Sequence, residues 1–306
     1  MTFSPFAIPP LDPGAQRVLE LMRAAARPPF ETLSPDEARF FYNAGRTLLQ
    51  PDPEDVAATR DLAAPGPNGA IPLRLYRGIG SATENAPALI YFHGGGWVIG
   101  DLDSHDQACR RLANEARACV IAVDYRLAPE HRFPAAITDS AAATRWIADQ
   151  AGALGLDAGR LAVGGDSAGG NIAAVMAIMA RDGTLPPLCF QVLIYPATDM
   201  AMTSGSVQRV TDGYPLTAIT MQWFIGHYLT GRQDVTDWRA SPLRAPDLAG
   251  VAPAWVLTCS HDPLADEGAA YARRLEAEGV RVTHMHMADQ MHGFLTMGKF
   301  CPAADT

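Results

Sequence analysis

Lysine is almost absent from this chain of 306 residues, which contains Lys299 and no other. Basic residues number 24 in all against 33 acidic ones, so the formal net charge at pH 7 is −9. Binding to nucleic acid depends on lysine and arginine side chains that neutralise phosphates, and proteins that do so usually carry a basic patch. The charge balance therefore predicts that this protein has no nucleic-acid partner.

Long apolar runs and paired cysteines are also missing. No apolar run reaches the roughly 18 residues that cross a membrane as a helix, and Met1–Pro5 lack the basic and apolar regions of a secretory signal. An odd number of cysteines without a Cys-x-x-Cys pair argues against a disulfide framework and against a zinc site. The cysteines are Cys109, Cys119, Cys189, Cys259 and Cys301. We therefore expect reduced thiols, no metal, no membrane insertion and a cytoplasmic location.

What the chain does contain is an alternation of buried strands with helices. Apolar residues make up 48% of the sequence, an ordinary content for a globular protein with a sizeable core. Strands are predicted at 71–77, 88–92, 119–123, 161–163, 190–195, 254–258 and 280–286, and helices at 106–118, 135–150, 171–181 and 267–278. Strands that are apolar almost throughout and alternate with helices form mostly parallel sheets covered on both faces. The predicted fold class is α/β.

Two stretches interrupt this alternation. The N-terminal stretch carries short helical pieces around 18–22 and at 35–49, the second after a cap at Ser34. Later, 198–249 is far longer than the dozen or so residues of a crossover, and it contains its own helical segment at 218–229. An insertion at the carboxyl edge of a parallel sheet lies over the crevice where such folds bind ligands. We therefore divide the chain into an N-terminal cap segment (1–60), a core in two parts (61–198 and 250–306) and a cap insertion (199–249).

The motif Gly-x-Ser-x-Gly occurs at Gly165–Gly169, between the strand 161–163 and the helix 171–181. This strand–turn–helix setting is the one that a nucleophile elbow requires, in which a tight turn lifts a serine hydroxyl above the edge of the sheet. The N-terminus of the following helix then directs its free N–H groups towards a developing oxyanion. Ser167 is therefore the candidate nucleophile.

Three consecutive glycines follow a strand within the motif His93–Trp97. Such glycines cost conformational entropy on folding, and an oxyanion hole gives a reason for them, because main-chain N–H groups must approach the oxygen with no side chain in the way. We predict that the N–H groups of Gly94, Gly95 and Ala168 are the oxyanion donors. His93 itself is predicted to hydrogen-bond the loop and not to act as a base.

A serine nucleophile needs a histidine as general base and a carboxylate that orients the histidine. Among the eight histidines, His292 follows the last predicted strand, where the base of this kind of sheet belongs. Asp262 follows the strand before it and is the predicted carboxylate, and Asp289, in the same short loop as His292, is a weaker candidate. Asp266 and Glu267 open the next helix, where acidic residues are expected for capping alone. The resulting order of serine, aspartate and histidine is that of an α/β-hydrolase triad.

Five blocks of the sequence together resemble the hormone-sensitive-lipase-like esterases, the bacterial family IV carboxylesterases of the α/β-hydrolase superfamily. The blocks are His93–Gly96, Asp124–Glu130, Gly165–Gly170, Asp262–Glu267 and His292–Phe294. The aspartate before the serine resembles the subgroup with the motif Gly-Asp-Ser-Ala-Gly. The resemblance implies an α/β-hydrolase fold with a helical cap, hydrolysis of short- to medium-chain carboxylic esters through an acyl-enzyme, no cofactor and often a homodimer. In the second block, Arg126 and Glu130 are expected to hold one turn together.

Two other functions remain open at this point. Imidazoles two residues apart on a strand share a face, so His284 and His286 could form a metal-hydrolase cluster with Asp289 and His292. Their spacing fits no usual metal motif, which disfavours this interpretation. The other alternative is a binding protein, since plant hormone receptors resemble these esterases but lack the catalytic histidine. The presence of His292 in its motif favours an enzyme.

The substrate pocket is less well defined by the sequence than the catalytic residues are. Five apolar or aromatic side chains are candidates for its lining: Trp97, Tyr195, Met221, Trp223 and Phe224. Each of them fits the packed core of a cap as well as the wall of a mostly apolar pocket. The expected ligand is a small-molecule ester.

Overall fold

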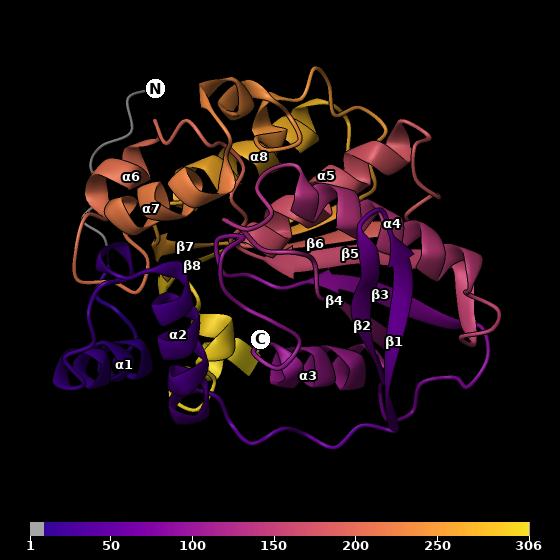
Figure 1. The fold of residues 1–306 in the computed structure, drawn as a ribbon, viewed down its shortest axis with the longest axis horizontal. Coiled ribbons are helices and arrows are strands. Elements are labelled where there is room, and N and C mark those ends of the chain that lie inside the picture. The colour runs from indigo at the N-terminus through magenta and orange to yellow at the C-terminus, as the bar shows by residue number, and fades with distance from the viewer. Residues whose placement is uncertain (1–8, 306) are drawn as a thin grey trace.

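A computed structural model describes residues 9–305 of the chain. The predicted absence of a secretory signal concerns Met1–Pro5, which lie outside this range. Residues 1–8 of the predicted segment 1–60 also lie outside it. An eight-stranded sheet runs through the molecule with helices on both of its faces, which confirms the α/β class (Figure 1). In the described part of the chain, none of the helices has both the length and the apolar character needed to span a membrane.

Most strands of the sheet are parallel. They are β1 (Ala58–Gly66), β2 (Gly69–Arg77), β3 (Ala86–Phe92), β4 (Cys119–Val123), β5 (Leu156–Asp166), β6 (Phe190–Ile194), β7 (Ala254–His261) and β8 (Val282–Met291). Their order is β1-β2-β4-β3-β5-β6-β7-β8; β2 is antiparallel to both neighbours, and β3 to β8 are parallel. β1 was not predicted from the sequence. This edge strand is mostly exposed and contains Pro65, so it lacks the apolar alternation of a core strand.

Four helices cover the two faces of the sheet. They are α3 (Asp106–Ala116), α4 (Ala135–Asp149), α5 (Ala168–Arg181) and α8 (Ala265–Ala277). In Figure 1, α3 lies below the sheet, and α4, α5 and α8 lie above it. Every residue of α5 from Ala168 to Ile178 is buried, as expected for a central helix that is apolar on all sides. The helix begins earlier than predicted because the turn after β5 leads directly into its first turn.

The N-terminal segment folds into α1 (Pro13–Ala24), a short 3-10 helix at Phe30–Thr32 and α2 (Pro35–Leu49). The predicted cap of α2 is confirmed. The hydroxyl of Ser34 accepts from the N–H of Glu37, and the carboxylate of Glu37 accepts from the N–H of Ser34. This reciprocal capping box satisfies two backbone donors that the helix itself leaves without partners.

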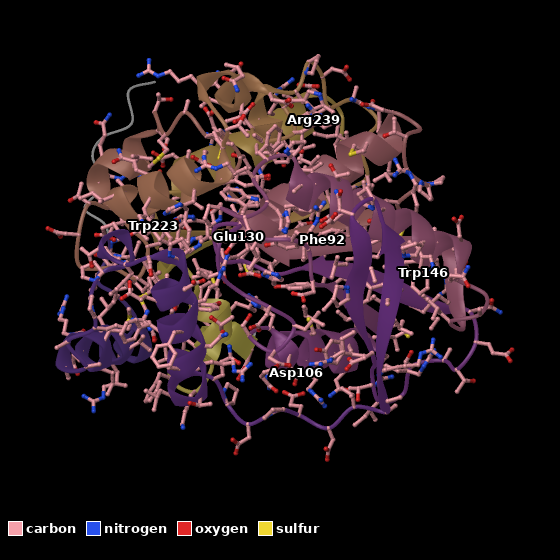
Figure 2. The ribbon with its side chains drawn as sticks, viewed as in Figure 1. Phe92, Asp106, Glu130, Trp146, Trp223 and Arg239 are labelled. Carbon is pink, nitrogen blue, oxygen red and sulfur yellow. The ribbon has the colours of Figure 1, made fainter. Side chains whose placement is uncertain are left out.

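The block Asp124–Glu130 makes its ion pairs with helices and not within itself. Glu130 accepts from both terminal nitrogens of Arg39 on α2, at 2.7 Å each, and it lies near the centre of Figure 2. Arg126 pairs with Asp139 on α4, with 2.7 Å between Nε and Oδ2. The expectation that Arg126 and Glu130 hold one turn together is therefore wrong. Each charged group instead makes a bidentate pair with a partner from another element.

The insertion contains α6 (Gly205–Arg209), α7 (Ala218–Tyr228) and short 3-10 helices at Arg232–Thr236 and Pro242–Arg244. One buried side chain of α5 joins the segment just before the insertion to the later part of the insertion. Asn171 donates from Nδ2 to the carbonyl oxygens of Ala197, at 2.9 Å, and Ala240, at 2.8 Å. Because Asn171 lies one turn after Ser167 in the chain, the helix that carries the predicted nucleophile also fixes the base of the insertion.

The side chains of Asp266 and Glu267, expected to cap α8 alone, bind the backbone of the insertion and its flank instead. Asp266 Oδ2 accepts from the N–H of Ser206 at 2.8 Å. Glu267 Oε1 accepts from the N–H groups of Thr198 and Asp199, at 2.7 and 3.1 Å, and the Glu267 side chain is buried. The two acidic residues therefore connect the first turn of α8 with the first part of the insertion. Their position at a helix start hides this role in the sequence.

Glu267 should give the protein a distinctive dependence of stability on pH. Burial raises the pKa of this carboxyl to about 8, against an ordinary value of 4.5. Between those two pH values the folded chain holds a proton that the unfolded chain has released, so the free energy of unfolding falls as the pH rises. The expected slope is about 1.4 kcal/mol per pH unit for this one proton.

The measurement compares urea unfolding of the wild type with that of Glu267→Gln between pH 5 and 9. Glutamine keeps an oxygen that accepts the two N–H groups but cannot ionise, so the variant should gain stability relative to the wild type as the pH rises to about 8. Glu276→Gln, on the exposed face of the same helix, is the matched control for the loss of a carboxyl. A stability difference that stays constant over this range would show that Glu267 is ionised in the folded protein.

Candidate active site

The order of the strands places the two glycine-containing motifs at one edge of the sheet. β3 has β4 on one side and β5 on the other, so the chain changes direction across the sheet at this point. At such a switch point the loops leaving neighbouring strands separate and form a crevice at the carboxyl ends of the strands. The three-glycine loop follows β3, and Ser167 follows β5. Both motifs therefore border the crevice.

The turn at Ser167 is tight and strained. Ser167 has φ +56° and ψ −116°, a conformation that non-glycine residues rarely adopt. A Cβ atom on Gly165 would lie 2.3 Å from the carbonyl oxygen of Phe92, and one on Gly169 would lie 1.8 Å from the same atom. Neither position can hold a side chain, so the tight turn requires glycine on both sides of Ser167. The turn packs directly on the end of β3.

Three side chains from three different loops meet in a hydrogen-bonded line. His292 Nε2 lies 2.9 Å from Ser167 Oγ, and His292 Nδ1 lies 2.7 Å from Asp262 Oδ2. All three residues are buried, and Asp262 is 0% exposed. A carboxylate only accepts, so Nδ1 carries a hydrogen and Nε2 is left free to accept the serine proton. The arrangement can generate a serine alkoxide during attack on an electrophile.

The loops around this line account for its geometry. Asp262 Oδ1 accepts from the N–H of Leu264 at 2.8 Å, which fixes the carboxylate after β7. Gly293 has φ +84°, so the chain turns sharply after His292 in a way that other residues resist. Asp289, the weaker candidate for the carboxylate, is exposed on β8, and its backbone carbonyl accepts from Asp12. It is therefore Asp262 that the structure places against His292.

The three-glycine loop differs from the prediction at one donor. The N–H of Gly94 donates to Asp166 Oδ1 at 2.9 Å, so this group is occupied and Gly94 has to be removed from the predicted oxyanion donors. In the described part of the chain, the N–H groups of Gly95, Gly96 and Ala168 have no hydrogen-bond partner. The sequence identified the loop, but the pairing of each N–H group depends on a carboxylate more than 70 residues away.

Both remaining glycines of the loop need to be glycine. Gly95 has φ +118°, and a Cβ atom there would lie 2.2 Å from the carbonyl oxygen of Ile99. Gly96 has φ +57°, and its Cβ atom would lie 2.2 Å from the ring of Phe224. Phe224 belongs to α7, so a side chain of the insertion packs directly on the three-glycine loop. The insertion and the loop therefore share one border of the crevice.

His93 hydrogen-bonds its own loop, as predicted. Its Nδ1 donates to the carbonyl oxygen of Gly94 at 2.8 Å, and its ring stacks on that of Tyr125 with 4.4 Å between centroids. The hydroxyl of Tyr125 donates to the carbonyl oxygen of His93 at 2.7 Å. Burial lowers the pKa of His93 to about 4, so the ring is neutral at neutral pH. His93 therefore supports the three-glycine loop and is not part of the hydrogen-bonded line that contains Ser167.

Asp166 is a buried carboxylate that the sequence analysis left without a role. Its Oδ1 accepts from the hydroxyl of Tyr91 at 2.7 Å as well as from Gly94, and His105 faces it from the loop before α3. Burial by itself raises the pKa of this carboxyl, but the facing His105 and these hydrogen bonds hold it below the usual value. The only hint in the sequence was the presence of an aspartate beside the serine of the elbow. Aspartate is rarely buried without a partner.

The five candidate pocket residues come from the three-glycine loop, the residue after β6 and the helix α7. The ring of Tyr195 lies 4.5 Å from that of His292, and Trp97 is stacked on Tyr228 of α7 at 4.4 Å. Trp223 is half-buried on α7 (Figure 2). Two further candidates on the same helix, Met221 and Phe224, are buried. Tyr195 contacts His292, and Phe224 contacts Gly96 of the three-glycine loop.

The alternative of a metal centre finds no support in the geometry. Within residues 9–305, no three histidine, cysteine, aspartate or glutamate side chains are grouped so that they could hold a metal ion. His284 and His286 both hydrogen-bond the hydroxyl of Thr258, at 2.9 and 2.8 Å, on the edge strand β8. His292 instead faces Ser167 and Asp262. The four residues of the possible metal cluster therefore do not converge.

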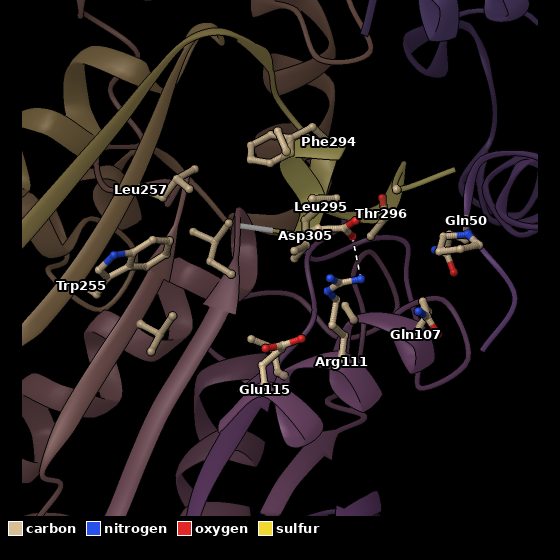
Figure 3. Close-up of a pocket in the computed structure, with 18 residues that line it drawn as sticks. Gln50, Gln107, Arg111, Glu115, Trp255, Leu257, Phe294, Leu295, Thr296 and Asp305 are labelled. Carbon is tan, nitrogen blue, oxygen red and sulfur yellow. Dashed lines mark ion pairs between the residues drawn. The ribbon is translucent and has the colours of Figure 1, made fainter. Parts of the chain in front are cut away.

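A separate cavity of about 150 Å³ lies away from this line of residues, between α3, the strands β6 and β7, and the last residues of the chain (Figure 3). Trp255 and Leu257 form part of its apolar floor, and Arg111 pairs with Asp305 at its border. Ser167, Asp262 and His292 do not line it. The cavity therefore belongs to the packing of the sheet against the C-terminal segment.

Comparison with known proteins agrees with this arrangement. A family model described as the alpha/beta hydrolase fold matches residues 89–296. An ethyl acetate hydrolase of Pseudomonas putida is 42% identical over 306 residues, covering 96% of this chain and 95% of that protein. A carboxylesterase of Mycobacterium tuberculosis is 46% identical over 225 residues, covering 72% and 70%.

Solved structures agree in the same way. An alpha/beta hydrolase enzyme from the metagenome of Lake Arreo has a TM-score of 0.93 with 45% identity, over 96% of this chain and 95% of that one. An esterase of Pyrobaculum calidifontis has a TM-score of 0.88 with 39% identity, over 96% and 94%. The match to the family model covers more than half of the chain and includes Ser167, Asp262 and His292. The chain therefore belongs to the α/β hydrolases, in the hormone-sensitive-lipase-like family.

Proposed function

We propose that this protein is a serine carboxylesterase that hydrolyses small carboxylic esters through an acyl-enzyme. The observation that carries the proposal is the line from Ser167 Oγ through His292 to Asp262, with distances of 2.9 and 2.7 Å. The names of the relatives, an ethyl acetate hydrolase and carboxylesterases, point to the same chemistry. Substrates of this class need a nucleophile, a base and an oxyanion site, and candidates for all three border the crevice.

The reaction proceeds in two steps. Ser167 Oγ attacks the ester carbonyl while His292 Nε2 removes the hydroxyl proton, and His292 then gives this proton to the departing alcohol as the C–O bond breaks. Water next attacks the acyl-enzyme with His292 again as the base, which releases the acid and returns the proton to Ser167. Asp262 keeps the imidazole in the productive tautomer and stabilises the imidazolium that forms in both steps.

The oxyanion donors in this proposal are the N–H groups of Gly95, Gly96 and Ala168. All three are unpaired in the described chain, and Ala168 opens α5, where the helix provides no acceptor for its N–H group. The positive end of the helix dipole adds to the attraction for a developing negative oxygen. One such donor is typically worth about 3 kcal/mol of barrier.

The segments 1–60 and 199–249 act together as the cap over this site in the same proposal. Their described parts are in contact: Thr220 on α7 donates to Glu31 at 3.0 Å, and the rings of Phe30 and Phe224 are 6.1 Å apart. Figure 1 shows α2 beside the ends of β7 and β8, with α7 above it. Phe224 links this pair of segments to Gly96, so the cap borders the proposed oxyanion site.

The cap leads us to predict a preference for short acyl chains. A series of p-nitrophenyl esters from acetate to dodecanoate should show the highest kcat/KM at acyl lengths of about two to eight carbons, because a capped pocket within one compact domain has limited volume. Phe224→Ala should shift the optimum towards longer chains, and Phe41→Ala, on a partly exposed face of α2, is the control. A wild-type optimum at dodecanoate would contradict the proposed role of the cap.

Covalent labelling tests the proposed function directly. A p-nitrophenyl alkylphosphonate should lose p-nitrophenolate as its phosphorus bonds to Ser167 Oγ, and the peptide containing Gly165–Gly169 should gain the mass of the phosphonyl group. A Lake Arreo ester hydrolase 45% identical to this chain has been solved with a bipyridine phosphonate derivative. Ligand binding without any labelling or ester turnover would favour the alternative of a receptor. A homodimer, a cytoplasmic location and the lack of a nucleic-acid partner stay predictions from sequence.

A further inference from the structure

His105 lies in the interior between the loop before α3 and the Ser167 turn, and the mechanism above does not use it. Its side chain is about 1% exposed. One ring nitrogen, Nδ1, lies 2.9 Å from Ser104 Oγ. The other, Nε2, lies 3.2 Å from Asp166 Oδ1 and 3.3 Å from Asp166 Oδ2. Both ring nitrogens are therefore hydrogen-bonded. The ring is positively charged if both nitrogens donate, and neutral if one of them accepts.

The hydrogen bonds of Ser104 show that Nδ1 is a donor. A serine hydroxyl has one hydrogen and two lone pairs. The hydrogen of Ser104 goes to the carbonyl oxygen of Asp101 at 2.8 Å, because a carbonyl can only accept. One lone pair of Ser104 accepts from the N–H of Asp101 at 2.9 Å. The remaining lone pair can only accept, so His105 Nδ1 carries a hydrogen and donates it.

The surroundings of Asp166 show that Nε2 is a donor as well. Oδ1 of this carboxylate already accepts from the hydroxyl of Tyr91 and the N–H of Gly94, a pattern that favours the ionised acid. Imidazole is also more basic than a carboxyl group, so a proton shared by His105 and Asp166 resides on the imidazole. The other titratable rings that face His105 are those of His93 and Tyr91, at 5.6 and 6.3 Å.

We propose that His105 is a buried imidazolium that serves as the counter-ion of Asp166, and that this ion pair positions the loop of the oxyanion donors. Asp166 holds Gly94, whose neighbours Gly95 and Gly96 supply the proposed donors. The part concerning the oxyanion rests on the proposed function. Without its counter-ion, the carboxylate of Asp166 would lie buried and unpaired beside a site where negative charge develops, and it would oppose that charge.

Three variants separate charge from shape. His105→Gln leaves the buried carboxylate without a cation, so kcat for p-nitrophenyl butyrate should fall about 10²-fold with little change in KM. Asp166→Asn keeps an oxygen for Gly94 and presents an amide that can donate to a neutral His105, so its kcat should fall less. The double variant replaces the ion pair with two amides, and it should recover at least about tenfold of the loss in His105→Gln.

Nitrogen NMR of protein labelled with ¹⁵N-histidine reads the charge without any use of activity. In the wild type at pH 7, one histidine should have both ring nitrogens protonated; its signals should vanish in His105→Gln and turn to those of a neutral ring in Asp166→Asn. A neutral His105 in the wild type at pH 7 would overturn the assignment of charge. An imidazolium signal combined with unchanged kcat in His105→Gln would overturn the positioning role. If the protein shows no ester hydrolysis at all, the NMR result still decides the charge, so the failure of the proposed function would be recognised separately.

Discussion

Replacing Ser167 with alanine is expected to lower kcat for p-nitrophenyl esters by about 10⁶-fold, because the variant loses the atom that forms the acyl-enzyme. The side chain is small and buried, and the turn that holds it is set by the backbone and by Gly165 and Gly169. We therefore expect the variant to fold. Stopped-flow and steady-state assays with p-nitrophenyl butyrate measure the loss, and mass spectrometry after phosphonate treatment shows whether any label is still attached.

Ser140→Ala is the matched control for this experiment. Ser140 is buried like Ser167, with 0% exposure against 8%, lies on α4, and its hydroxyl has no hydrogen-bond partner within residues 9–305. The same loss of one oxygen should therefore leave kcat nearly unchanged. A Ser167→Ala protein that hydrolyses esters at the rate of the wild type would refute the nucleophile and with it the proposed mechanism.

Asp262→Asn is expected to lower kcat by about 10⁴-fold with little loss of structure. An amide is isosteric with the carboxylate, and its oxygen can still accept from the N–H of Leu264. Its NH₂ group, however, faces His292 Nδ1 and donates to it, so the hydrogen of the imidazole moves to Nε2. Nε2 then has no lone pair for the Ser167 proton, and the imidazolium loses the negative charge that stabilises it.

The comparison with Asp289→Asn decides between the two carboxylates that the sequence offered. Asp289 is exposed on β8, so its amide variant should keep the kcat of the wild type. The rate of Asp262→Asn should also recover in part at high pH, where hydroxide replaces the missing base. Equal rates for Asp262→Asn and the wild type, or a large loss in Asp289→Asn, would show that the line of hydrogen bonds is not the catalytic one.

The three-glycine motif predicts a loop of oxyanion donors but does not show which of its N–H groups are available. Three glycines after a strand predicted a loop whose N–H groups could serve as oxyanion donors. Which of those N–H groups stay free depends on Asp166, because its carboxylate accepts a hydrogen bond from the N–H of Gly94. The motif and the aspartate are far apart in the sequence, and no local pattern encodes their contact. Removing Gly94 from the donor set leaves Gly95 and Gly96 beside Ala168.

Local patterns were sufficient for most of the framework. Four parts of the framework are recognisable from patterns within a few residues of the chain: the capping box at Ser34, the apolar strands β3 and β4, the central helix α5 and the elbow at Ser167. Such patterns follow directly from residue type and spacing. β1 was missed because an exposed edge strand with a proline has no apolar periodicity, and its partner β2 determines where it pairs.

The sequence by itself determined the class of fold, the order of serine, aspartate and histidine, and the family, because each is written in short motifs and in the alternation of apolar segments. Only the tertiary structure decided which groups meet. It brought Asp262 and not Asp289 to His292, joined Glu267 to the start of the insertion, and enclosed His105 with Asp166. The physical reason is that buried polar groups must find partners, and the fold alone determines which donors and acceptors lie within 3 Å or so of each other.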